Sequence, residues 1–295
     1  MEALLRGAAE LPDKPRSREE LIDLLVDLLG LPCGTAGGIV ADPVTATVVG
    51  LAAARYRVLA DVGWDVDARG LVAAPPVTVV VGDDAHAGLF RALRLLGLGR
   101  ERVVRIRTDG QGRMRPTLIP PLHPPAIVCT QVGEAASGAV DPVAAVCAEV
   151  HDADAWVHVD GSFGLWAAAS PLTRDLLTGV AYADSWATAA PDDSGLVFAR
   201  DAGALQVALE LTRPAPGVQL DRARVVALVE DACGQARRLA AGLAKAGFPV
   251  LNEVVLDRVV VGVDDGGTRW RGRPAMFLRA GHGLDVDAVI RALMR

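Results

Sequence analysis

The stretch Trp156–Arg200 has the sequence WVHVDGSFGLWAAASPLTRDLLTGVAYADSWATAAPDDSGLVFAR, and it decides the fold class. Its opening residues form a short apolar run that ends in Asp160, a pattern that predicts a buried strand. Open α/β sheets bind ligands at the carboxyl ends of their strands, so Asp160 is a candidate functional residue. A simpler interpretation stays open, because Asp160, Gly161 and Ser162 form an Asp-Gly-Ser sequence that is common in turns.

Strand-like and helix-like segments alternate around this stretch. Residues 77–81, 103–107 and 126–131 have the composition of strands. Residues 221–246 form a long helical pattern that ends before Gly247. The alternation predicts a mostly parallel sheet, flanked by helices and joined by right-handed crossovers.

The composition limits the class of function. The chain has 295 residues and a formal net charge of -6, which favours about two domains and argues against a nucleic-acid-binding protein. It contains no apolar run of about 18 residues and no secretory pattern at its start, so we expect a cytoplasmic protein without membrane contact. The four cysteines lack the spacing of a metal site, and none is expected.

Three motifs in the opening stretch resemble the group II pyridoxal-phosphate (PLP) decarboxylases. They are HVDGSFG, ADSWAT and DSGLVFARD, supported by GDDAHAGLFRALRLLG and TQVGEAASGAVDP upstream and by WRGRPAM downstream. The resemblance implies the aspartate aminotransferase fold, which is the type I fold of PLP-dependent transferases. It divides the chain into a lead-in at 1–16, a large domain at 17–212 and a reduced small α+β domain at 213–295.

The resemblance also implies roles for individual residues. Asp160 matches the aspartate that pairs with the pyridinium nitrogen of PLP, and His86 matches the histidine that stacks on the ring. Without the resemblance, a histidine in a first helical turn is more often a surface residue. Ser162 stands where relatives usually carry alanine. The remaining candidate substrate-binding residues are Ser137, Trp186 and Asp192.

Two departures from the family pattern concern the cofactor. The Schiff-base lysine of the family lies in a stretch resembling DAHKWLNVPYDSG, whereas this chain has TAAPDDSG there, and its only lysines are Lys14 and Lys245. Asp42 and Pro43 replace the glycine-rich turn that holds the phosphate in relatives, adding a negative charge and removing an amide donor. We therefore expect a shortened member that has lost PLP binding and uses no cofactor.

Three functions remain open at this point. The first is a PLP-independent enzyme acting on a small amine or amino-acid-derived substrate, with His86 and Asp160 as an acid/base pair and Ser162 or Asp192 as auxiliary groups. The second is a non-catalytic partner or regulatory subunit of a complete homologue. The third is a residual PLP-dependent amino-acid decarboxylase. The resemblance further implies a homodimer or a heterodimer with a homologue.

Overall fold

The computed structural model describes residues 17–294 apart from 214, 216–217, 219, 265–267 and 282–283. The predicted lead-in at 1–16 lies outside the described residues. Within them, a large sheet is built from seven strands. These strands are β1 (Ala36–Val40), β2 (Thr78–Gly82), β3 (Val104–Ile106), β4 (Ala126–Gln131), β5 (Trp156–Asp160), β6 (Ser185–Ala189) and β7 (Gly195–Ala199).

The strand order of the large sheet is β1-β7-β6-β5-β4-β2-β3. Strands β2 to β6 pair in parallel, while β7 is antiparallel to both β6 and β1. This confirms the predicted mostly parallel α/β sheet of the type I class. Because parallel strands end at the same edge, the segments that follow β2, β5 and β6 gather in one region.

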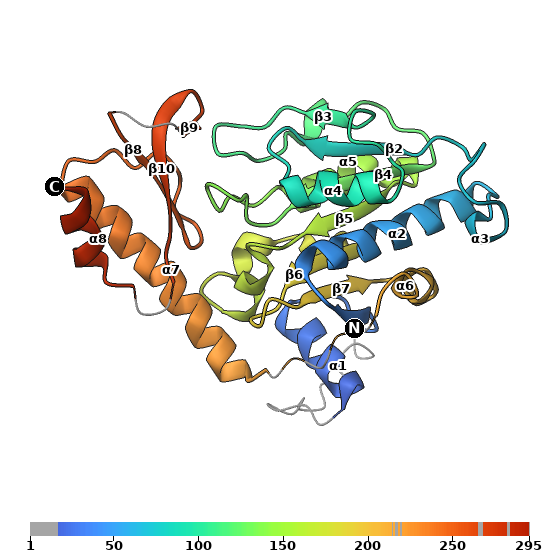
Figure 1. Cartoon of the computed structure of the whole chain (residues 1–295), viewed down its shortest axis with the longest axis horizontal. Coiled ribbons are helices and arrows are strands. Elements are labelled where there is room, and N and C mark those ends of the chain that lie inside the picture. Colours follow the sequence, from blue (N-terminus) through green and yellow to red (C-terminus); the bar gives the residue numbers. More distant parts are fainter. Residues whose placement is uncertain are drawn as a thin grey trace.

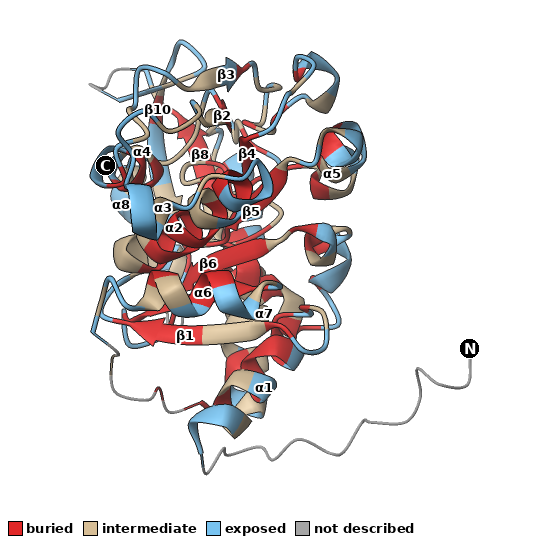
Figure 2. Ribbon diagram, turned by 90° about the vertical axis from the view of Figure 1, so that its right-hand side faces the viewer, coloured by how far each residue is buried: buried red, intermediate tan, exposed pale blue. Residues whose placement is uncertain are grey.

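Helices cover both faces of the large sheet (Figure 1). Their bounds are α1 (Arg18–Leu28), α2 (Pro43–Asp61), α3 (Val66–Arg69), α4 (Ala87–Leu95), α5 (Val143–Val150) and α6 (Ala202–Leu209), with short 3₁₀ turns between them. One core packs α2, α4 and α6 on one face, and a second core packs α1 and α5 on the other. Figure 2 shows the buried residues concentrated on the strands between these layers, as a sheet covered on both faces requires.

Helix α2 packs closely against the large sheet. Asp42 caps this helix, because its Oδ1 accepts a hydrogen bond from the backbone N–H of Thr45 at 3.0 Å, and Pro43 occupies the first turn. Gly50 lies over His158 of β5, and a Cβ at this glycine would come within 2.6 Å of the imidazole. The glycine therefore lets the helix rest directly on β5, next to the strand end that carries Asp160.

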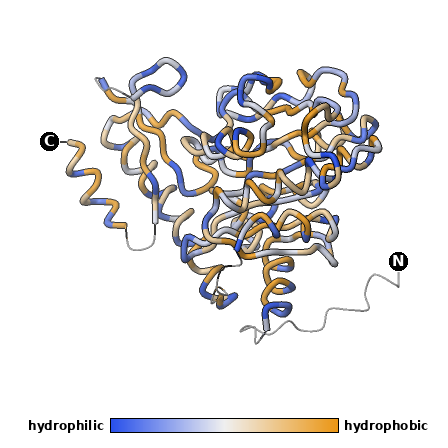
Figure 3. The backbone as a smooth tube through the Cα atoms, turned by 45° about the vertical axis from the view of Figure 1, so that its right-hand side comes forward, coloured by the Kyte–Doolittle hydropathy of each residue, from blue (hydrophilic) through white to orange (hydrophobic). Residues whose placement is uncertain are grey.

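The C-terminal part forms a smaller antiparallel sheet in the order β8-β10-β9. Its elements are α7 (Arg222–Lys245), β8 (Arg258–Gly262), β9 (Arg269–Trp270), β10 (Arg273–Arg279) and α8 (Val286–Leu293). Helix α7 contributes Val225 to the core of the large sheet and Leu239 to the core of the small one, and α8 carries both hydrophobic and hydrophilic residues (Figure 3). The predicted domain boundary at 212/213 stays a prediction, since α7 packs in both cores.

In the part of the chain that the structure describes, no helix combines the length and the apolar character needed to cross a lipid bilayer. The location in the cytoplasm stays a prediction.

Candidate functional site

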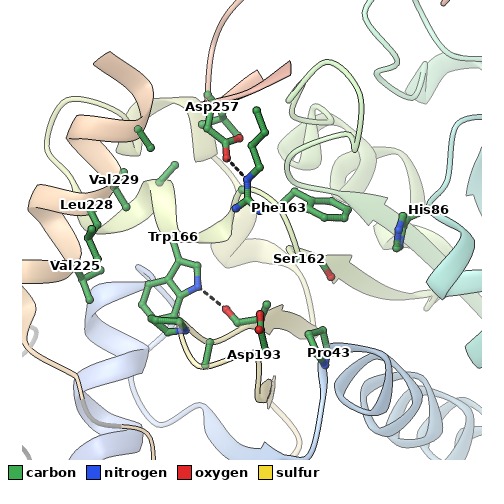
Figure 4. Close-up of a pocket in the computed structure, with 18 of the residues that line it drawn as sticks. Pro43, His86, Ser162, Phe163, Trp166, Asp193, Val225, Leu228, Val229 and Asp257 are labelled. Carbon is green, nitrogen blue, oxygen red and sulfur yellow. Dashed lines mark hydrogen bonds and ion pairs between the residues drawn. The ribbon is translucent and has the colours of Figure 1, made fainter. Parts of the chain in front are cut away.

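A pocket of about 670 Å³ opens at the carboxyl edge of the large sheet (Figure 4). It is lined by the first turn of α2, the junction of β2 with α4, the segment after β5, the connection of β6 with β7, and one face of α7. Its volume falls in the range that small-molecule sites in proteins have. The pocket lies where an open α/β sheet is expected to bind a ligand.

His86 enters the pocket from the start of α4. Its Nδ1 accepts a hydrogen bond from the backbone N–H of Gly88 at 3.2 Å, and its own backbone N–H donates to Gln131 Oε1 at 3.0 Å. The imidazole meets the ring of Phe163 edge-on, with centroids 5.0 Å apart. Because Nδ1 is an acceptor, the neutral ring carries its proton on Nε2. His86 thus combines a structural cap with one N–H available to a ligand.

Asp160 is the last residue of β5 and is 5% exposed. Its Oδ1 accepts hydrogen bonds from the backbone N–H of Ser162 at 3.1 Å and from Ser162 Oγ at 2.6 Å. Ser162 lines the pocket, whereas Asp160 is not among the lining residues. The carboxyl group is therefore joined to the pocket through the serine, and the Asp-Gly-Ser turn is present. The functional role of Asp160 stays a prediction.

His158 accompanies Asp160 on the same face of β5 but does not line the pocket. It is fully buried, and its Nδ1 lies 2.8 Å from Ser185 Oγ, which also accepts from Trp156 Nε1 at 2.8 Å. Burial lowers the pKa of His158 to about 4, although the negative charge of Asp160 works in the opposite direction. The imidazole is consequently neutral at pH 7.

Three candidate residues lie away from the pocket. Ser137 is fully buried, with its Oγ 2.7 Å from the carbonyl oxygen of Gln111. Trp186 is fully buried and donates from Nε1 to the Val180 carbonyl at 2.9 Å. Asp192 is exposed, while its neighbour Asp193 lines the pocket. The substrate-binding roles of Ser137, Trp186 and Asp192 stay predictions, and this pocket does not include them.

Helix α7 contributes a wall of the pocket that the sequence did not predict. Val225, Leu228 and Val229 form an apolar strip on this wall, and Trp166 lies opposite, held by a hydrogen bond from its Nε1 to the Ala189 carbonyl at 2.6 Å (Figure 4). No local signal identifies such residues, because α7 is brought to the pocket by packing between distant segments. The apolar spacing of α7 is explained equally well by an ordinary core.

A charged cluster closes the pocket on the side of the small sheet. Asp257 lies 3.3 Å from Arg258 Nε and 2.8 Å from Arg279 Nε, and the Arg258 guanidinium stacks over the Phe163 ring at 5.0 Å. Burial lowers the pKa of Arg258, and the charge of Asp257 opposes this shift. The cluster presents both signs of charge to the cavity, through Asp257 and Arg279.

Asp42 places a negative charge at the α2 end of the pocket. Partial burial works to raise its pKa, but hydrogen bonds from the hydroxyl and backbone of Thr45, together with the charge of Arg91, outweigh that effect and lower it. The carboxylate is ionised at neutral pH and occupies the backbone N–H of Thr45 itself. An anion would therefore find this helix N-terminus already capped.

Residues 18–212 match the family model of the pyridoxal-dependent decarboxylase conserved domain. The chain belongs to this family. Among curated relatives, human acidic amino acid decarboxylase GADL1 is 31% identical over 140 residues, covering 45% of this chain and 26% of the relative. Rice tryptophan decarboxylase 1 is 31% identical over 185 residues, covering 56% of this chain and 35% of the relative. The chain thus matches only about a third or less of the length of these family members.

Solved structures of the family show the same fold. Mouse CSAD superposes with a TM-score of 0.76 at 18% identity, over 94% of this chain and 74% of that chain. Rice TDC with PLP and tryptamine superposes with a TM-score of 0.75 at 21% identity, over 92% of this chain and 72% of that chain. At these identities the likeness establishes the fold alone.

Membership in a pyridoxal-dependent family corrects our expectation that the chain uses no cofactor. We based that expectation on two local departures from the family pattern, at 42–43 and at 188–195. We gave too little weight to the other residues that line the cavity. The structure still brings His86 and the Asp160–Ser162 pair to one end of a pocket large enough for the PLP ring and an amine. These residues fit the ring. The fit is poorer at α2, where Asp42 already caps the helix.

Proposed function

We propose that the protein binds a small amine or amino-acid-derived ligand in this pocket, together with PLP that is not covalently linked to a lysine. The observation that carries the proposal is the lining itself: His86 and Ser162 stand at one end, and no lysine is among the described lining residues. The described chain offers one lysine, Lys245, at the far end of α7. The names of the relatives, which include tryptophan and acidic amino acid decarboxylases, support an amino-acid-derived ligand.

The roles of the residues follow from their hydrogen bonds. Asp160, held by Ser162, places a carboxyl group beside the pocket and so favours a protonated nitrogen on the bound group. His86 donates from Nε2 to an oxygen of the ligand, since its Nδ1 is occupied by Gly88. The apolar face of α7 excludes water, which strengthens both interactions. PLP, when bound, supplies an electron sink for the carbanion that decarboxylation leaves.

The absence of a lysine in the described lining limits the rate of any reaction. In enzymes that use it, a lysine amine anchors PLP through a Schiff base and also moves protons. Neither the imidazole of His86 nor the carboxyl group of Asp160 can form a Schiff base. We therefore propose that turnover is slow and that binding is the dominant activity. The absence of a lysine among the described lining residues also favours the second candidate function, a non-catalytic partner or regulatory subunit.

A spectroscopic titration tests the cofactor part of the proposal. Adding PLP to the purified protein should change the visible absorbance of PLP, the change should disappear on dialysis, and borohydride should leave both lysines unmodified by mass spectrometry. The matched control is Lys245→Arg, which should bind PLP equally well. One equivalent of reduced adduct on Lys14 or Lys245 would contradict the proposal, as would the absence of binding at millimolar PLP.

The ligand part is tested separately by calorimetry in the presence and absence of PLP. Aromatic and acidic amino acids and their amines form the panel, and His86→Ala should weaken binding of the best ligand by about tenfold through loss of one hydrogen bond.

Assembly, which we propose to be a homodimer or a pair with a complete homologue, is measured by light scattering. If turnover appears only after the homologue is added, the partner function takes precedence over the enzymatic one.

A further inference from the structure

A second cavity, of about 700 Å³, lies on the outer side of α4, against the edge strand β3. Its lining is dominated by arginine side chains. These are Arg91 and Arg94 from α4, Arg100 from the following turn and Arg105 from the middle of β3. We refer to these four residues and the space between them as the arginine groove.

The charge of the arginine groove is opposite to that of the whole chain. The protein has 36 acidic and 30 basic residues, yet Glu101 is the only acid in the lining, and it lies 3.9 Å from Arg100. Among the described residues, no ion pair within 4.0 Å joins Arg91, Arg94 or Arg105 to a carboxylate. The arginine groove therefore holds four guanidinium groups and one carboxylate, an excess of three positive charges in its lining.

Contacts with the surrounding structure place the Arg105 side chain, and helix geometry places Arg91 beside Arg94. The Arg105 guanidinium stacks over the ring of Phe90 at 4.6 Å, and its Nη1 lies 3.4 Å from the carbonyl oxygen of Asp83. Arg91 and Arg94 are three residues apart on α4, so they project from the same side of the helix. The like charges repel one another in this arrangement, and a bound anion would relieve the repulsion.

We propose that the arginine groove binds a small oligophosphate anion with at least two phosphate groups. Guanidinium groups match phosphate oxygens in bidentate geometry, and the excess of three positive charges in the lining is more than one phosphate neutralises. The cavity has the volume of a small-molecule site, and the net charge of -6 opposes the approach of a long polyanion. The groove is distinct from the pocket at the carboxyl edge of the large sheet, since the two linings have no residue in common.

Calorimetry with three probes tests the proposal at low ionic strength. Inorganic tripolyphosphate should bind at least tenfold more tightly than orthophosphate, because it engages more guanidinium groups. ATP is the third probe and identifies the source of the phosphates: equal or tighter binding than tripolyphosphate indicates a nucleotide, and weaker binding indicates an inorganic oligophosphate. Raising the salt concentration should weaken binding of all three probes.

A pair of double variants locates the binding site. Arg94→Gln with Arg105→Gln should weaken tripolyphosphate at least tenfold, whereas Arg237→Gln with Arg238→Gln, which removes two exposed charges from α7, should change it less than twofold. Thermal unfolding without anion checks that the variants are folded, and Arg91→Gln with Arg94→Gln replaces the first pair if Arg105 proves necessary for folding. Equal binding by the groove and control variants would overturn the proposal, as would tighter binding of a single-stranded DNA oligomer than of tripolyphosphate.

Discussion

The segment after β5 and the segment between β6 and β7 contain the same local turn in two different environments. In the first, Asp160 Oδ1 accepts from the N–H and Oγ of Ser162 at 3.1 and 2.6 Å. In the second, Asp192 Oδ1 accepts from the N–H and Oγ of Ser194 at 3.1 and 2.7 Å. Local chemistry alone does not distinguish these two turns.

Their positions in the sheet do distinguish them. Asp160 ends a central strand that has parallel neighbours on both sides, and it is 5% exposed beside a pocket. Asp192 lies in the short connection between antiparallel strands and is exposed. A buried carboxylate with few partners interacts strongly with a cationic ligand, whereas an exposed one is screened by water. Strand order, and not the turn motif, therefore decides that Asp160 is buried beside a pocket while Asp192 is exposed to water.

The largest effect is expected when each aspartate loses its charge. Asp160→Asn should weaken the best amine ligand of the pocket by about 100-fold, because a charge-assisted interaction in a buried site is lost. Asp192→Asn should change the affinity less than twofold. Calorimetry on both variants measures the difference. Equal losses would mean that the two turns are functionally equivalent and that the comparison fails.

The two turns also differ in the residue two positions before the aspartate. This residue is His158 before Asp160 and Ala190 before Asp192. The pKa of His158 is lowered to about 4 in the folded protein, so the unfolded chain takes up a proton between pH 6.5 and 4 that the folded chain does not. Stability from this residue is therefore present above pH 6.5 and lost as the pH falls through that window.

We expect the wild type to lose about 2 kcal/mol more unfolding free energy than His158→Gln when the pH falls from 7 to 5. Urea denaturation of both proteins at the two pH values gives this difference directly, and groups such as Asp141 cancel because both proteins contain them. Parallel pH dependence in the two proteins would show that the buried imidazole does not titrate in this window.

The smallest effect concerns the serines of the two turns. Ser162→Ala should lower the free energy of unfolding by about 1 kcal/mol more than Ser194→Ala does, because it removes a partner from a carboxylate that is more completely buried. Chemical denaturation at pH 7 measures both changes. A larger loss from Ser194→Ala would indicate that the exposed turn contributes more to folding than its environment suggests.

Much of the fold was predictable from the chain itself. The apolar runs at 77–81, 126–131 and 156–160 became the parallel strands β2, β4 and β5, since continuous hydrophobic segments require burial on both faces. Asp42 and Pro43 start α2 as their chemistry predicts. His86 and Ser162 reached the pocket, because each follows a parallel strand at the same edge of the sheet.

What the sequence determined by itself is the inventory of chemical groups: the strands, the caps, the position of each acid and histidine, and the number of lysines. Only the tertiary structure decided which groups share a cavity. It joined the α7 face to the strand ends, left Trp186 in the core and Asp192 in solvent, and gathered four arginines beside α4. The physical reason is that periodicity is a local property, whereas burial and electrostatic environment depend on contacts between segments that are distant in the chain.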